Sequence, residues 1–291
     1  MRDYEFPLRE KVLFYLDYAA RKTITNWFEV RKPRLKLFVY EVLYSGAKLL
    51  DRQLVIKSPF RTAYAETRFG RFSIRPGTAD MSMVSPAFER RDLNFLLKTM
   101  KHLRGKNKRI LFLDIGADLG TFTVSVGNAF KKDKGVLLAA FEPAGPSFSL
   151  LEENVSLNSL REKTALFNIA LWSEDDKELD FGFNPEAPGS SGLKTKGPSF
   201  KVAKIKTKTL DSILGEMAAD FEALVIKMDI EGAEIEVLKG AERTLKKGKE
   251  IYLLAEDFIR PEVVGYLQGI GAEFIRKLTP YNSFWKIKKF I

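Results

Sequence analysis

Acidic side chains stand at the ends of several apolar stretches, and they are the first sign of chemistry in this sequence. Glu142, for example, follows the apolar run 136–141 and lies 28 residues beyond Asp114. Four acids share this kind of position: Asp114, Glu142, Asp229 and Glu256. Because ligands of open α/β sheets bind outside the carboxyl ends of the strands, these acids are expected to gather at one ligand-binding edge.

The stretch from Ile110 to Gly120 predicts a buried strand and a tight glycine turn, and residues 121–124 predict the start of a helix. Its spacing, Gly116-x-x-x-Gly120, lacks the G-x-G-x-x-G pattern that closes on a pyrophosphate, and Asp118 would repel a phosphate. A glycine turn with carboxylates suits S-adenosylmethionine, which carries an ammonium and a sulfonium but no phosphate. A turn without a ligand is the alternative.

A carboxylate at the end of the second strand, Glu142, is placed to accept both hydroxyls of a ribose. Residues 164–172 predict a third strand, and the adenine ring is expected near its end. The candidate cofactor-binding residues are therefore Asp114, Gly116, Asp118, Gly120, Thr121, Phe122, Glu142, Pro143, Asn168 and Ala170.

Composition sets the broad class. The chain has 291 residues, 45% of them hydrophobic, no cysteine and a net charge of +10. No apolar run approaches the roughly 18 residues of a membrane span, and the N-terminus lacks the apolar core of a signal peptide. Residues 1–109 carry +13 and residues 110–291 carry −3, so the basic character lies at the front. A cytoplasmic protein is expected.

Residues 1–65 predict a basic, amphipathic helical extension. It either packs on the main domain or makes peripheral contact with a membrane surface. Residues 66–291 predict one catalytic domain, with a lead-in strand and helix over 66–109 and a core over 110–291. Alternating strands and helices in that core, closed by a final hairpin, predict an α/β fold: a doubly wound, Rossmann-like sheet of seven strands.

A hydroxyl nucleophile needs a base, and the acids around the fourth and fifth strands are the candidates: Asp229, Glu231 and Glu256, with Asp257 beside them. We prefer Asp229, with Glu231 second. The alternative for Glu231 is charge compensation in the first turn of a helix. Carboxylates also suit Mg²⁺ or Ca²⁺, but no histidine joins the group, and we assign no metal ligand.

Taken together, four segments resemble the FkbM family of S-adenosylmethionine-dependent methyltransferases. They are Leu113–Gly120, Phe141–Pro143, Thr209–Asp211 and Ile226–Glu234, within a resemblance that covers about residues 70–278. The sequence departs from the family pattern at Asp118, where asparagine is usual, and at Asp257-Phe258, where a histidine often stands. The resemblance implies a class I methyltransferase-like fold and O-methylation of a hydroxyl on a sugar, glycan, lipid or secondary metabolite.

Two other functions stay open at this point. A nicotinamide-dependent oxidoreductase is disfavoured by the missing phosphate-binding glycines. A non-catalytic module of the same fold would bind a polyanion or a membrane through the basic front of the chain. The expected partner is a small-molecule or glycan acceptor, without sequence-specific nucleic-acid binding, and the sequence gives no oligomeric state.

Overall fold

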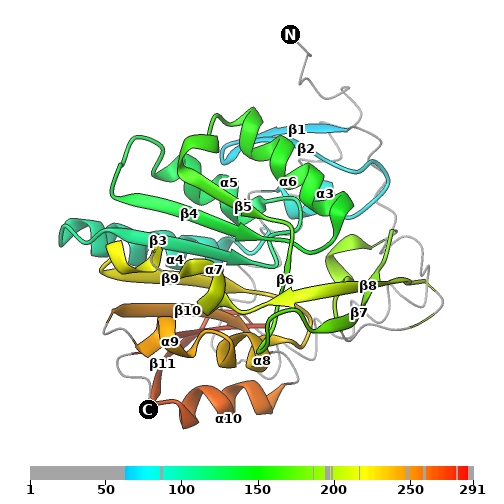
Figure 1. The fold of residues 1–291 in the computed structure, drawn as a ribbon. Helices are drawn as coiled ribbons and strands as arrows, with labels where there is room; N and C mark the ends of the chain where they lie inside the picture. The colour runs from blue at the N-terminus through cyan, green and yellow to red at the C-terminus, as the bar shows by residue number, and fades with distance from the viewer. Residues whose placement is uncertain are drawn as a thin grey trace, which may run out of the picture. The chain divides into compact units, whose positions relative to one another are not determined.

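The computed structural model describes residues 63–85, 88–185, 187–193, 197, 199–215, 217–246, 249–257, 260–279 and 281–287. The chain divides into two units, Met1–Arg90 and Arg91–Ile291. Figure 1 shows the described helices and strands along the chain. All but the last three residues of the predicted extension, residues 1–65, lie outside the described residues. The helical extension and its membrane contact therefore stay predictions.

In the first unit, the described residues form a small hairpin. It consists of β1 (Tyr64–Thr67) and β2 (Gly70–Ser73), paired antiparallel, and is followed by the one-turn helix α3 (Asp80–Met83). Phe72 and Ile74 are both buried, as their alternation with polar residues predicts. The predicted lead-in strand is thus present.

The second unit contains the seven-stranded sheet that the sequence predicts. Its strand order is β11-β12-β10-β9-β3-β4-β5, and β12 runs antiparallel to both of its neighbours while the other pairs are parallel. The strands are β3 (Ile110–Ile115), β4 (Val136–Phe141), β5 (Thr164–Phe167), β9 (Ala223–Met228), β10 (Glu250–Glu256), β11 (Ala272–Lys277) and β12 (Asn282–Ile287).

Helices connect these strands in the expected alternation. They are α4 (Arg90–Gly105), α5 (Thr121–Ala129), α6 (Gly145–Leu157), α7 (Leu210–Leu214), α8 (Glu234–Lys239), α9 (Glu242–Lys246) and α10 (Pro261–Gly269), with the short 3₁₀ turns η1 (Arg161–Lys163), η2 (Pro188–Ser190) and η3 (Met217–Asp220). No helix in the described part of the chain has the length and apolar character that crossing a bilayer requires.

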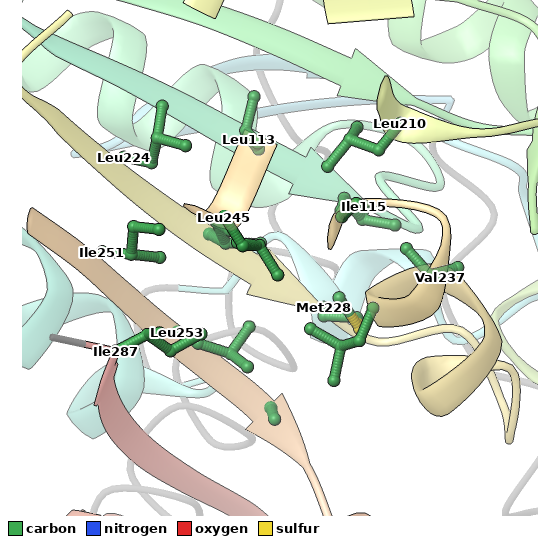
Figure 2. Close-up of a cluster of buried hydrophobic side chains, with 14 of the residues drawn as sticks. Leu113, Ile115, Leu210, Leu224, Met228, Val237, Leu245, Ile251, Leu253 and Ile287 are labelled. Atoms are coloured by element: carbon green, nitrogen blue, oxygen red, sulfur yellow. The ribbon is translucent and has the colours of Figure 1, made fainter. Parts of the chain in front are cut away.

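One face of the sheet carries a large apolar core against α7, α8, α9 and α10 (Figure 2). Strand residues such as Ile115 and Met228 meet Val237 of α8 and Leu245 of α9 in this cluster. Side chains alternate across a strand, so the neighbours of Ile115 and Met228 point to the opposite face. That alternation sends the polar side chains of β3 and β9 away from this core.

A second, three-stranded sheet has the order β6-β8-β7. It contains β6 (Ala170–Leu171), β7 (Glu178–Phe183) and β8 (Lys201–Lys208). The single third strand predicted over residues 164–172 is therefore wrong. Pairing with β4 ends at Phe141↔Phe167, and the chain then crosses to pair Ala170 with Thr207. The strand breaks because β4 has no residues left to pair beyond Phe141.

Candidate active site

The glycine turn between β3 and α5 lies directly against the end of β9. Gly116 has φ +78°, and a Cβ atom placed on it would lie 1.9 Å from the backbone oxygen of Asp229. Asp118 and Gly120 also adopt positive φ, +45° and +90°. Left-handed backbone favours glycine, so the two glycines are needed for this turn. The cofactor turn and the first candidate base are thus in backbone contact.

Asp114, near the end of β3, is buried with only 1% of its surface exposed. One of its carboxylate oxygens accepts a 2.6 Å hydrogen bond from the Thr123 hydroxyl, and the other lies 3.9 Å from the Lys227 amine. Burial raises the pKa of Asp114, and Lys227 opposes that shift. The contacts of Asp114 support the turn from behind, and its predicted contact with the cofactor stays a prediction.

Lys227 connects the turn to the base. Its amine donates to the Gly116 carbonyl at 2.9 Å and lies 3.3 Å from a carboxylate oxygen of Asp229. It also lies 5.6 Å from the ring centre of Phe122, the second residue of α5. A buried ammonium needs such partners, because burying an unpaired charge is costly. Lys227 therefore fixes Asp229 relative to the glycine turn.

Glu142 follows β4 and is 7% exposed. Its two oxygens accept hydrogen bonds from the backbone amides of Asp118, at 2.9 Å, and Ala144, at 2.8 Å. The Asn168 side-chain amide donates to the carbonyl oxygens of Glu142, at 2.8 Å, and Pro143, at 3.1 Å. This brings Glu142, Pro143 and Asn168 together beside the Asp118 turn, as a shared cofactor site requires.

The candidate bases form a second cluster at the same edge. One carboxylate oxygen from each of Asp229, Glu231 and Glu256 lies within 4.8 Å of the other two. Glu256 is the last residue of β10, and Asp229 directly follows β9. Because β9 and β10 are adjacent parallel strands, their ends meet as the sequence predicts.

Glu231 does not belong to a helix. It has φ +53° and stands three residues before α8, which begins at Glu234. The alternative interpretation of Glu231 as charge compensation within the first helical turn is therefore wrong. A non-glycine residue with positive φ is uncommon and is found preferentially at functional sites. Glu231 instead turns its side chain toward Arg260, with an Oε2–Nη2 distance of 3.2 Å.

Burial and crowding change how these acids titrate. Burial, followed by repulsion from Asp229 and Glu231, raises the pKa of Glu256 to about 8. Burial and the charge of Asp229 also raise the pKa of Glu231, whereas Arg260 lowers it. Like charges at short range disfavour ionisation of both groups. At neutral pH, Glu256 is therefore mainly a carboxylic acid, which can donate a hydrogen bond but is a poor base.

Comparison with known proteins places the acids of this sheet edge within a known family of domains. A model of the FkbM methyltransferase domain matches residues 114–274, more than half of the chain. The chain belongs to the FkbM methyltransferase family. The match spans every acid of the site, from Asp114 to Glu256, and confirms the resemblance that the sequence motifs carry.

Two relatives are also named methyltransferases. Methyltransferase 1 of Beauveria bassiana (strain ARSEF 2860) is 27% identical over 146 residues, which cover 44% of this chain and 57% of that protein. Methyltransferase sdnD of Sordaria araneosa is 26% identical over 196 residues, which cover 56% of this chain and 74% of that protein. The alignment thus spans less than two thirds of the length of the first relative.

Among solved structures, a SAM-dependent O-methyltransferase from Thermotoga maritima covers 79% of this chain and 86% of its own, with 12% identity and a TM-score of 0.42. Family membership identifies a methyltransferase domain, and the sheet order agrees with the doubly wound, Rossmann-like fold that the sequence predicts. Membership does not support the nicotinamide-dependent oxidoreductase that the sequence left open.

The residues of the turn fit S-adenosylmethionine, the cofactor that the family resemblance implies. Thr121 opens α5, and its buried hydroxyl has no hydrogen-bond partner among the described residues. Gly116 leaves no side chain over the turn, and Glu142 can accept further hydrogen bonds from a ribose. Ala170 is buried in β6 and pairs with Thr207, so its predicted contact with the adenine stays a prediction.

Three residues that sequence analysis assigned no role also belong to this region. Lys227 and Arg260 are the cations of the two acid groups. Asp92 in α4 is fully buried, accepts a 3.0 Å hydrogen bond from Asn282, and has a pKa that burial raises to about 7. The signal for Asp92 was its position on the same helical face as the apolar Leu96.

The acid cluster has the geometry to share a cation, and the structure places the Arg260 guanidinium against it. The sequence left a divalent ion as an alternative for these carboxylates. Because a guanidinium already balances part of their charge, we derive no step through a metal ion.

The single histidine, His102, is exposed on α4.

Proposed function

We propose that this protein methylates the oxygen of a hydroxyl group on a sugar, a glycan, a lipid or a secondary metabolite, with Asp229 as the general base. One observation carries the proposal. The side chain of Asp229 is 38% exposed, while its backbone packs against Gly116 of the cofactor turn. An acid that is open to an acceptor and fixed beside the cofactor site can take a proton where methyl transfer occurs.

The cofactor side of the site provides binding and orientation. Bound S-adenosylmethionine supplies a methyl group that its sulfonium has already activated. Glu142 would accept the ribose hydroxyls, because its carboxylate is held by the amides of Asp118 and Ala144. Asp114, Asp118 and the glycine turn would surround the positively charged part of the ligand. Holding two reactants in line is itself a large source of catalysis.

The acceptor side provides the proton transfer. As the hydroxyl oxygen bonds to the methyl carbon, the bond from that carbon to sulfur would break and a neutral thioether would leave. The proposed destination of the hydroxyl proton is a carboxylate oxygen of Asp229. Glu256, whose pKa is about 8, is protonated at neutral pH and would donate a hydrogen bond instead. Glu231 pairs with Arg260 as Asp229 pairs with Lys227, so the preference for Asp229 rests on its backbone contact with the cofactor turn.

The experiment is transfer of a labelled methyl group from S-adenosylmethionine to a panel of extracts, read by mass spectrometry. Fractions of sugars, glycans, lipids and secondary metabolites would be tested separately, and the product would be fragmented to locate the label. The proposal expects the label on a hydroxyl oxygen, and labelling slower by about 10²–10⁴ with Asp229→Asn. A label on nitrogen or carbon would contradict it.

A protein that binds S-adenosylmethionine but transfers no label in any fraction would point to the non-catalytic module instead. Most of the basic extension that such a module would use, residues 1–65, lies outside the described part of the chain. Binding of the full chain to anionic vesicles or to a polyanion, compared with a chain lacking those residues, would then be the next measurement.

A further inference from the structure

Arg260, the residue before α10, makes ion pairs with three glutamates from different parts of the fold. Its guanidinium lies 2.7 Å from Glu234 at the start of α8, 3.2 Å from Glu231 in the preceding turn and 3.5 Å from Glu256 at the end of β10. The Arg260 side chain is only 20% exposed. A planar guanidinium with several donors is suited to bridge more than one carboxylate.

Each glutamate depends on this arginine to a different degree. The Glu234 side chain is almost fully buried, and its Oε1 also accepts a 3.1 Å hydrogen bond from the Gly232 amide. One buried oxygen of Glu256, Oε2, has no hydrogen-bond partner among the described residues, and Arg260 is the cation nearest to it in the ion pairs. Removing Arg260 would leave the almost fully buried Glu234 side chain without its cation, which is strongly unfavourable.

Two cations of the described residues, Lys227 and Arg260, thus pair with different acids of the site. Lys227 lies beside Asp229 and Asp114 on the cofactor side, whereas Arg260 lies among the three glutamates. The two sets still influence each other, because the charge of Asp229 raises the pKa values of both Glu231 and Glu256. The protonation of the glutamates therefore affects how much negative charge surrounds Asp229.

We infer that Arg260 is a positioning residue for methyl transfer: it holds Glu231, Glu234 and Glu256 in one group and so leaves Asp229, held by Lys227, as the acid that takes the proton. The role of Asp229 in this inference rests on the proposed function. Arg260 itself touches neither reactant. It acts through the carboxylates that border the base.

The consequence is a specific dependence on pH. The groups that face Glu256 are Asp229, Glu231 and Glu234, which raise its pKa, and Arg260, which lowers it. The groups that face Glu231 are the same arginine, together with Asp229 and Glu234. Without Arg260, both glutamates keep their protons to higher pH, and the acid cluster binds more protons at neutral pH.

The test is a carboxyl-carbon NMR titration of the full-length protein and of Arg260→Gln, with resonances assigned through Glu256→Gln and Glu231→Gln. In the unsubstituted protein, Glu256 is expected to titrate near pH 8. In Arg260→Gln its midpoint should rise by about one pH unit or more, the usual effect of one neighbouring charge. An arginine that only stabilises the fold would also move that midpoint, so the turnover profile described below decides the positioning role.

Two further variants complete the test. Arg260→Lys keeps one charge but loses the planar bridge. Its Glu256 midpoint should therefore lie between those of the unsubstituted protein and of Arg260→Gln. This variant also keeps the test possible if Arg260→Gln fails to fold. Arg243→Gln is the matched control, because Arg243 pairs with Asp211 on the surface with 77% of its side chain exposed. An unchanged Glu256 midpoint in folded Arg260→Gln or Arg260→Lys would overturn the inference.

The titration uses neither cofactor nor acceptor, so it separates this inference from the proposed function. Once an acceptor is known, the acidic limb of the turnover profile should move to higher pH in Arg260→Gln and partly return in Arg260→Lys. A shifted NMR midpoint with an unmoved turnover profile would show that Arg260 controls the glutamates but that they do not influence the base.

Discussion

The two sides of the site treat their carboxylates differently. On the cofactor side, the oxygens of Glu142 accept hydrogen bonds from backbone amides. Asp114 accepts a hydrogen bond from the Thr123 hydroxyl and lies near the Lys227 ammonium. On the acceptor side, three glutamates share the guanidinium of Arg260. The first arrangement fixes geometry. The second includes Glu256, whose pKa of about 8 lies near neutral pH, as is common for groups at sites of proton transfer.

The largest effect is expected from Asp229→Asn. If Asp229 takes the acceptor's proton, the amide variant should lose about 10²–10⁴ in turnover, the usual contribution of general base catalysis. Its cofactor affinity should stay normal, because the Asn side chain keeps the shape and the Gly116 contact involves the backbone. A turnover assay with calorimetry in parallel checks both. Asp220→Asn, at an exposed site, is the control.

Stability should depend on pH through Glu256. Its pKa is raised from 4.5 to about 8, so the folded protein holds this proton when the unfolded chain has lost it. The resulting stabilisation is complete below about pH 4.5 and is lost as the pH rises through about 8. Because one pKa unit corresponds to about 1.4 kcal/mol, the loss is on the order of a few kcal/mol.

Denaturant unfolding of Glu256→Gln between pH 5 and pH 8 measures that effect. The variant should lose much less stability over this range. The remaining slope of the same sign belongs to the other acids whose pKa values are raised, Asp92, Asp114 and Glu231. The exposed Glu152→Gln should keep the full slope. Parallel curves for Glu256→Gln and the unsubstituted protein would contradict the burial of an acid at the end of β10.

Glu142→Ala tests the cofactor side. Removal of this carboxylate should weaken S-adenosylmethionine binding by about 1.5–3 kcal/mol, the range for hydrogen bonds to charged groups. Part of the loss would come from the freed amides of Asp118 and Ala144, which shape the turn. Calorimetry against Glu153→Ala, an exposed acid on α6, is the measurement. An unchanged dissociation constant would show that Glu142 supports the turn but does not contribute to cofactor binding.

The smallest effect is expected from Glu231→Gln. Its ion pair with Arg260 is partly exposed to solvent, and such pairs contribute at most about 1 kcal/mol. Turnover should therefore fall by less than about tenfold, since that factor corresponds to about 1.4 kcal/mol. A larger loss than in Asp229→Asn would move the base from the end of β9 to the turn before α8.

Sequence alone predicted the sheet, because β3, β4, β9 and β10 are nearly continuous apolar runs and each is followed or ended by an acid. It also placed Asp114, Glu142, Asp229 and Glu256 at one edge, since parallel strands share their direction. Both predictions need only local sequence patterns, without contacts between distant segments.

The remaining features depend on contacts between distant segments. The break after Phe167 reflects where β4 ends, and the left-handed Glu231 reflects the packing of the loop before α8. Arg260 shows no local sign of its role, because its three partners come from β10, α8 and the turn between β9 and α8. Asp92 did leave a sign, an acid on the apolar face of an amphipathic helix.

The central claim is that the two sides of one sheet edge have separate tasks, and one paired measurement tests it most directly. Turnover and cofactor dissociation constants should be determined for Asp229→Asn and Glu142→Ala under the same conditions. The account predicts that the first variant loses turnover at normal affinity, whereas the second loses affinity. Equal losses of affinity in both variants, with turnover at saturating cofactor unchanged in Asp229→Asn, would contradict it.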